Sequence, residues 1–172
     1  MKLNIKETAV FALLGALMYA TKIIMEILPN VHLLGVFIVA ITAVYRKKAL
    51  YPIYIYVFIN GLFSGFAMWW IPYLYIWTVL WGAVMLLPKN IPERARPIVY
   101  MTVCALHGFL FGTLYAPAQA LLFGLDFKGM IAWIAAGLPW DFVHGVSNFI
   151  CGTLICPVIA VLKHSEKYIT RN

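Results

Sequence analysis

The chain has few charged residues, and this scarcity excludes most classes of water-soluble protein. Asp, Glu, Lys and Arg make up 11% of its 172 residues, whereas a soluble domain carries about 25%. So few charges cannot coat a surface that faces water. A soluble enzyme, an extracellular module and a disordered chain are therefore excluded.

Motifs typical of catalysis and metal binding are also missing. The three cysteines lie inside apolar segments, and the chain has no CxxC motif and no Cys/His metal spacing. It has no HExxH, GxSxG or phosphate-cradling glycine motif either. We therefore expect no catalytic residue, no metal and no cofactor, and we interpret the cysteines as small packing residues.

Hydrophobic residues, by contrast, make up 64% of the chain, and aromatic residues make up 16%. At roughly 20 apolar residues per helical crossing, the chain has room for about six or seven crossings with short loops. This composition predicts an all-α, polytopic integral membrane protein with no soluble domain beside it.

The net charge of +7 comes from four basic clusters that separate the apolar stretches. Only Lys22 and Lys128 lie outside these clusters, which are Lys2/Lys6, Arg46-Lys47-Lys48, Lys89/Arg94/Arg96 and Lys163/Lys167/Arg171. Such a distribution is typical of cytoplasmic loops and weighs against nucleic-acid binding. It secondarily favours attraction to the anionic lipids of the bilayer.

Four clusters on one side of a membrane require three hairpins, which predicts a bundle of six spans with both termini cytoplasmic. The whole chain, 1–172, is then one membrane domain with spans near 7–28, 31–46, 49–66, 69–88, 97–123 and 130–162. The second span is short, because Leu33 to Tyr45 gives only about 20 Å of helix against an apolar core of about 30 Å. It is tilted little, extended by an irregular start at Val31-His32, or tucked behind its neighbours.

Small residues recur every four positions on two of the predicted helices. They are Ala12, Ala16 and Ala20 on the first helix and Gly108, Gly112, Ala116 and Ala120 on the fifth. This spacing forms a groove that another helix can approach closely. Each groove either packs against a helix of the same chain or docks a partner subunit in the membrane.

Aromatic residues form a ridge on the fourth predicted helix. Trp69, Tyr73, Trp77 and Trp81 follow one another at four-residue intervals, with Trp70 beside them. An aromatic belt at the membrane interface explains the residues at the outer end. It explains Trp77 and Trp81 poorly, because these continue towards the middle of the bilayer. The alternative is a wall on which a flat ligand stacks.

Polar side chains inside the predicted spans concentrate in the outer half of the membrane. Asp141, His144 and Asn148 share one face of the sixth helix, since offsets of three and four residues nearly complete helical turns. The others are Asn60, His107, Tyr115 and Gln119, together with Lys22 and Glu26, which we expect to pair near the outer end of the first span. Ionisable groups in a span are costly and usually face an interior cavity. These polar side chains either form hydrogen bonds that hold the helices together or line an outward-facing ligand pocket, and we favour the pocket.

The size, the six spans, the inside termini and the Ala12/Ala16/Ala20 stripe together resemble the substrate-binding (S) component of an energy-coupling factor (ECF) vitamin transporter. The resemblance covers nearly the whole chain. It implies a multi-pass protein of a prokaryotic cell membrane whose first-helix alanines dock on a transmembrane coupling subunit, driven by two cytoplasmic ATPases. It also implies capture of a scarce water-soluble vitamin outside and a toppling motion that releases it inside. The chain has no Walker motif, so we expect no ATP hydrolysis by the chain itself.

Depth in the membrane selects the residues that we expect to bind the ligand. Trp69, Trp70, Tyr73 and Trp77 would stack a heteroaromatic ring, while polar side chains would fix its edges. The polar members of this predicted site are Asn60, His107, Tyr115, Gln119, Asp141, His144 and Asn148. A ring-containing vitamin or precursor is favoured, among them thiamine, riboflavin, a pyridoxine-like or queuosine-like base and the larger cobalamin.

Two other classes of protein stay open. In a stand-alone carrier or channel, Asp141 and His144 would form a proton relay, and uptake would need no ATPase. A small membrane enzyme or assembly factor is the third class, although the only cysteine near Asp141 and His144 is Cys151, two turns further on. A vitamin riboswitch or a biosynthetic gene next to this gene would favour vitamin capture.

Overall fold

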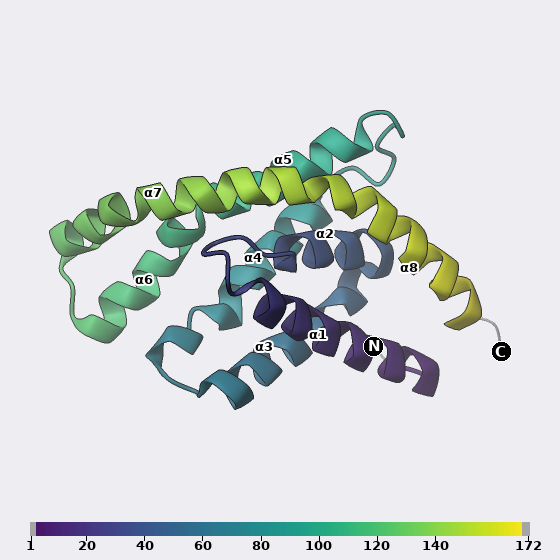
Figure 1. Cartoon of the computed structure of the whole chain (residues 1–172), viewed down its shortest axis with the longest axis horizontal. Helices are drawn as coiled ribbons and strands as arrows, with labels where there is room; N and C mark the ends of the chain where they lie inside the picture. The colour runs from purple at the N-terminus through teal and green to yellow at the C-terminus, as the bar shows by residue number, and fades with distance from the viewer. Residues whose placement is uncertain (1–2, 170–172) are drawn as a thin grey trace.

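The computed structural model describes residues 3–169, and all regular structure in that range is helical (Figure 1). The α-helices are α1 (Ile5–Met25), α2 (Leu34–Tyr45), α3 (Leu50–Ser64), α4 (Tyr73–Leu86), α5 (Arg96–Phe109), α6 (Phe111–Phe123), α7 (Phe127–Cys151) and α8 (Ile155–Ile169). Short 3-10 helices connect some of them, namely η1 (Arg46–Ala49), η2 (Met68–Trp70) and η3 (Gly152–Leu154). Lys2 and Arg171, two members of the predicted basic clusters, lie outside the described residues.

Four helical stretches in the described part of the chain are long and apolar enough to cross a membrane. They are Ile5–Met25, Met68–Leu86, Arg96–Phe123 and Phe127–Lys167. The prediction of an all-helical, membrane-type protein is confirmed in this form. With 12 and 15 residues, α2 and α3 measure only about 18 and 22 Å, so neither matches an apolar core of about 30 Å in length. The structure therefore shows four helical stretches of membrane length, and the predicted number of six spans stays a prediction.

The short helix α2 lies inside the molecule and packs against α4 and α8 (Figure 1). Nine of its 12 residues are buried, and the buried residues lie on all sides of the helix. A helix that is hydrophobic all round is typical of a core position. Of the three explanations for the short second span, the structure shows burial behind neighbouring helices and an irregular start at Val31-His32.

Two close helix contacts depend on glycine. α1 packs along α3, where a Cβ on Gly15 would lie 2.5 Å from Cγ2 of Ile55. α5 packs along α7, where a Cβ on Gly108 would lie 2.9 Å from the backbone of Gly145. The small-residue groove that includes Gly108 and Gly112 is therefore used for packing within the chain, which was one of its two predicted uses.

The predicted fifth span, 97–123, is interrupted at Leu110, where α5 ends and α6 begins. The chain turns there next to α7, and the backbone N–H of Gly112 donates to both carboxylate oxygens of Asp141, at 2.9 and 3.1 Å. Asp141 thus supplies an acceptor to the first turn of α6, whose N–H groups have no partner within their own helix. The predicted span therefore matches the membrane-length stretch Arg96–Phe123, but this stretch contains two helices rather than one.

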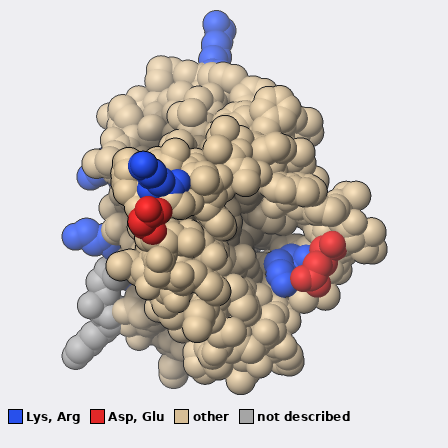
Figure 2. All heavy atoms as spheres, turned by 90° about the vertical axis from the view of Figure 1, so that its left-hand side faces the viewer, with Lys and Arg blue, Asp and Glu red and all other residues tan. Residues whose placement is uncertain are grey.

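The two ends of the bundle differ in charge. At one end, Glu7 near the start of α1 forms an ion pair with Lys48 of η1, and both described termini lie on the same side of the molecule (Figure 1). Lys22 and Glu26 lie near the opposite end of α1. Figure 2 shows the face at the turn between α6 and α7, where nearly all visible atoms belong to uncharged residues. Basic side chains from three of the clusters, namely Arg46, Lys89, Arg96 and Lys163, line two neighbouring cavities.

Candidate ligand cavity

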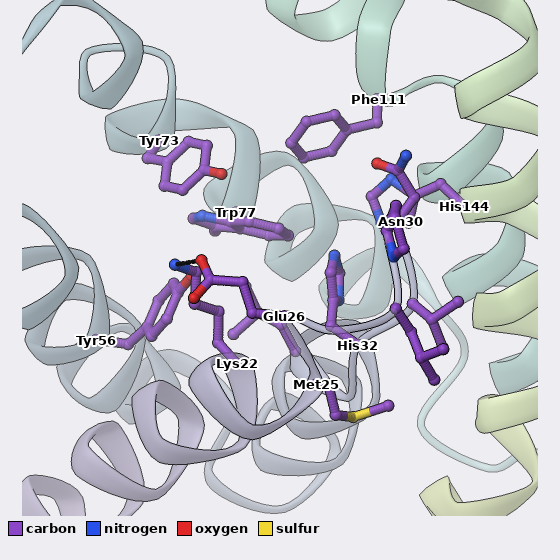
Figure 3. A pocket seen from close by; sticks show the side chains of 14 residues that line it. Lys22, Met25, Glu26, Asn30, His32, Tyr56, Tyr73, Trp77, Phe111 and His144 are labelled. Carbon is purple, nitrogen blue, oxygen red and sulfur yellow. Dashed lines mark hydrogen bonds and ion pairs between the residues drawn. The ribbon is translucent and has the colours of Figure 1, made fainter. Parts of the chain in front are cut away.

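A cavity of about 210 Å³ is lined by no residue of the four basic clusters (Figure 3). It is bounded by the last turn of α1, the loop between α1 and α2, and side chains from α3, α4, α6 and α7. The lining residues are Lys22, Met25, Glu26, Leu28, Pro29, Asn30, Val31, His32, Leu34, Tyr56, Tyr73, Trp77, Phe111 and His144. Helices from both halves of the chain therefore contribute to one site.

Aromatic side chains form one wall of the cavity, with Trp77 at the centre (Figure 3). The ring centroid of Trp77 lies 5.5 Å from that of Tyr73, 5.6 Å from that of Phe111 and 6.3 Å from that of Tyr56. Tyr73 and Tyr56 present their rings edge-on to Trp77, at interplanar angles of 76° and 78°. Rings fixed by one another in this way form a rigid surface suited to a flat, apolar ligand face.

Two imidazoles lie on the wall opposite Tyr56 and Tyr73. The rings of His32 and His144 are 4.7 Å apart between centroids, and Phe111 lies 4.9 Å from His144. Among the described residues, no group pairs with Nδ1 of His32, Nε2 of His144 or Nε1 of Trp77, although all three atoms are buried. A buried polar atom without a partner costs about 1–3 kcal/mol. These three nitrogens therefore favour a ligand that offers complementary donors and acceptors.

His32 lies in the loop between α1 and α2, and it is neutral at physiological pH. Burial lowers the pKa of its imidazole from 6.5 to about 4, because the charged form would lose its hydration. A neutral imidazole presents one N–H donor and one acceptor nitrogen. His32 therefore supplies hydrogen-bonding capacity without positive charge.

An ion pair lies at the rim of the cavity. Nζ of Lys22 is 2.8 Å from Oε1 of Glu26, one helical turn along α1, so the pairing predicted from their spacing is confirmed. Behind the rim, the hydroxyl of Ser147 on α7 donates to the carbonyl of Asn30 at 2.9 Å. Asn30 has a φ of 60°, in the left-handed region that Asn adopts more readily than most residues. The hydrogen bond from Ser147 holds this part of the loop against α7.

The residues predicted to bind the ligand fall into two groups in the structure. Tyr73, Trp77 and His144 line the cavity. Trp69, Trp70, Asn60, His107, Tyr115, Gln119, Asp141 and Asn148 do not. The predicted set therefore does not converge as a whole on one cavity.

The polar face of α7 shows why the predicted residues do not all line the cavity. Both carboxylate oxygens of Asp141 accept from the N–H of Gly112, and Nδ2 of Asn148 donates to the carbonyl of Cys104 at 3.2 Å. His144, on the same face between them, is the one that reaches the cavity. The three residues share a face of the helix, as predicted, but they contact different elements. No hydrogen bond between Asp141 and His144 is present in the structure, so the pairing expected for a proton relay is not seen.

The remaining predicted residues lie around the cavity rather than on it. Trp70 donates from its indole to the carbonyl of Val57, and Tyr115 donates from its hydroxyl to the carbonyl of Trp69. His107 lies behind Trp77, with ring centroids 5.6 Å apart, and its Nε2 is 3.1 Å from the carbonyl of Ile76. Of these side chains, His107 directly contacts the wall residue Trp77. Asn60 is 1% exposed, and neither of its amide atoms has a partner among the described residues.

The sequence prediction missed His32, Tyr56 and Phe111. His32 follows the Pro29-Asn30 break, and a histidine next to a loop in a chain with four histidines was a usable indication. Tyr56 and Phe111 had no such indication, because aromatic residues are common throughout this chain and neither residue belongs to a spaced ridge. Their position on the cavity wall follows from tertiary packing alone.

The alanine stripe of α1 lies away from the cavity. Ala12, Ala16 and Ala20 are all exposed, whereas Gly15 on the same helix is buried against α3. The stripe therefore makes no close helix contact within the described part of the chain. This arrangement contrasts with the groove of Gly108 and Gly112, which α7 fills.

Comparisons with protein-family models, with curated proteins and with solved structures found no match to this chain. Among the described residues, no cluster of three or more His, Cys, Asp or Glu side chains is arranged to hold a metal ion. The polar side chains on the wall of the cavity are His, Tyr, Trp, Asn and the Lys22–Glu26 pair. The arrangement is therefore suited to holding a small ring compound by stacking and hydrogen bonds.

Proposed function

We propose that this chain captures a small ring-containing vitamin or vitamin precursor, as the S component of an ECF-type transporter in a prokaryotic cell membrane. The observation that carries the proposal is the cavity in which Trp77, His32 and His144 each leave a buried nitrogen without a partner. A ligand with polar ring edges would pair with these nitrogens while its face stacks on the aromatic wall.

The volume of the cavity favours a small ligand. About 210 Å³ is below the range of roughly 300–1,000 Å³ typical of sites for drug-sized molecules. A compound of one or two rings, such as a pyridoxine-like or queuosine-like base or thiamine, is compatible with that size. The much larger cobalamin is not, so it leaves the set of ligands that we propose.

The exposed alanine stripe supports the second half of the proposal, which is coupling to partner subunits. Ala12, Ala16 and Ala20 leave a shallow surface on α1 that a helix of a transmembrane coupling subunit can approach closely. In the proposed transporter, two cytoplasmic ATPases on that subunit supply the energy. The topology that we propose has six spans, with the basic end in the cytoplasm and the aromatic cavity open to the exterior.

A stand-alone proton-coupled carrier is less well supported. That mechanism needs Asp141 and His144 to exchange a proton, but the carboxylate of Asp141 accepts two contacts from Gly112. No other feature of the cavity favours a relay over simple binding.

The first experiment identifies the ligand. Small molecules that co-purify with the protein are identified by mass spectrometry, and the compound found is titrated back into ligand-free protein by isothermal titration calorimetry. We expect Trp77→Phe to weaken its binding about tenfold, because the variant keeps a stacking ring but loses the indole N–H.

Trp81→Phe is the matched control for this substitution. Trp81 lies one turn further along α4, outside the cavity, and its indole donates to the carbonyl of Arg46 at 3.0 Å. The control should bind the ligand as the wild type does. The proposal is wrong if no ring compound binds, or if both substitutions weaken binding equally.

A further inference from the structure

Two adjoining cavities lie at the basic end of the molecule. Their volumes are about 260 and 300 Å³, and Ala43, Lys89 and Tyr100 line both of them. Neither cavity shares a lining residue with the aromatic cavity. They therefore form a separate site, which the proposed vitamin capture does not use.

Four cationic side chains line these two cavities, and no acidic side chain does. Arg46 comes from η1, Lys89 from the loop before α5, Arg96 from α5 and Lys163 from α8. Three basic clusters that are far apart in the sequence thus meet at one place. Positive charges held close together repel one another, and a bound anion would relieve that repulsion.

The two guanidinium groups are held by backbone carbonyls. Nη2 of Arg46 donates to the carbonyl of Met85 at 2.9 Å, and Nε of Arg96 donates to the carbonyl of Ile91 at 3.0 Å. Nη1 of Arg96 also lies 3.5 Å from Oε1 of Glu93, whose carboxylate is on the surface and lines neither cavity. Each guanidinium has five N–H donors, so most donors of each group stay available to an anion.

The backbone of Arg46 is itself unusual. Its φ is 52°, in the left-handed region that is unfavourable for a residue with a Cβ. The indole of Trp81 donates to the Arg46 carbonyl, and the Arg46 side chain is tied to Met85. Such conformations persist where the surroundings hold them in place, and they cluster at binding sites. Here the conformation places a guanidinium on the wall of the cavity.

Apolar side chains complete the two cavities. Val84 and Leu87 line one of them, and Ile159 lines the other. A site that combines cations with apolar walls at the end of membrane-length helices matches a phospholipid, in which a phosphate adjoins methylene groups. We propose that the joined cavities bind the phosphate of an anionic phospholipid headgroup at the basic end of this protein.

The test is native mass spectrometry of the purified full-length chain in detergent micelles, with phosphatidylglycerol or phosphatidylcholine added. We expect the wild type to retain phosphatidylglycerol in preference to phosphatidylcholine. Lys89→Gln and Lys163→Gln should each weaken that retention about fivefold, the effect expected for one charge near an anionic lipid.

Lys47→Gln is the matched control, because this substitution also removes one positive charge from the same end of the molecule. Lys47 adjoins Arg46 in sequence but lines a different groove, formed with Tyr51, Tyr54 and Ile55. The control should retain phosphatidylglycerol as the wild type does. Equal weakening in Lys47→Gln would overturn the proposal, because it would reveal attraction to the basic surface as a whole.

A second arm separates the lipid from free phosphate. Inorganic phosphate is titrated into the protein in phosphatidylcholine nanodiscs by isothermal titration calorimetry. Binding that Lys89→Gln weakens and Lys47→Gln does not would support the phosphate site while assigning it a free anion. If the wild type binds neither phosphatidylglycerol nor inorganic phosphate, the proposal is wrong.

Discussion

The contact between Asp141 and Gly112 leads to a prediction that separates helix capping from proton transfer. The carboxylate accepts from the Gly112 N–H at 2.9 and 3.1 Å, and Asp141 is 6% exposed. Asp141→Ala leaves that buried N–H without an acceptor, which costs about 1–3 kcal/mol. Asp141→Asn keeps an acceptor oxygen and loses only the favourable charge at the start of α6, about 0.3–1 kcal/mol.

These free energies translate into different thermal shifts. A change of 1 kcal/mol moves the Tm of a protein of this size by about 2–4 °C. We therefore expect Asp141→Ala to lower the Tm of the purified protein by about 2–12 °C and Asp141→Asn by about 1–4 °C, measured by fluorescence during heating in detergent. Gly112→Ala should destabilise the protein as well, since its Cβ would lie 2.5 Å from Oδ2 of Asp141.

The same variants test the proton relay. Asp141 does not line the aromatic cavity, so Asp141→Asn should leave ligand affinity unchanged at every pH where the protein is folded. A pH-dependent loss of affinity in Asp141→Asn would refute this reasoning and restore the relay. A Tm in Asp141→Asn as low as in Asp141→Ala would refute the capping role.

Three further predictions address docking, pH and packing. Ala16→Trp should abolish uptake in cells that supply the coupling subunits while leaving ligand binding intact, whereas Ala136→Trp, at an exposed alanine of α7, should affect neither. Because burial lowers the pKa of His32 from 6.5 to about 4, protonation favours the unfolded chain. The denaturation midpoint should therefore fall as the pH drops below about 6.5 towards 4, and His32→Gln should reduce that slope. Gly108→Ala should lower the Tm through contacts of 2.9 Å with the Gly145 backbone, an overpacking cost of about 1–3 kcal/mol. Gly82→Ala is its control, since a Cβ there meets nothing within 4 Å and the substitution should be neutral or stabilising.

Local patterns in the sequence were sufficient for several features of the structure. Composition and hydropathy predict helices of membrane length because the bilayer imposes that length on any apolar helix. The spacing of Lys22 and Glu26 predicts their ion pair because residues four apart are neighbours on a helix. The break at Pro29-Asn30 predicts the end of α1 within a few residues, because proline and asparagine favour turns.

Helical periodicity could not predict the break at Leu110 or the partners of the polar residues. At the break, the N–H of Gly112 donates to Asp141, which is 29 residues away in sequence and next to it in space. Asp141, His144 and Asn148 were correctly placed on one face, but that face meets three different surroundings along its length. The depth of a residue in the membrane is estimated by counting along one helix, and this count contains no information on which side chains of other helices lie next to it.

The amino-acid sequence by itself determined the class of the molecule, the presence of helices of membrane length and the placement of the basic clusters between apolar stretches, because these depend on composition and on neighbours along the chain. Tertiary structure alone decided that Tyr56, Phe111 and His32 join Trp77 and His144 around one cavity. It also decided that one small-residue groove is filled by α7 while the alanines of α1 stay exposed. The physical reason is that a cavity or an interface is a property of several helices packed together, and the residues that form it are separated by most of the chain.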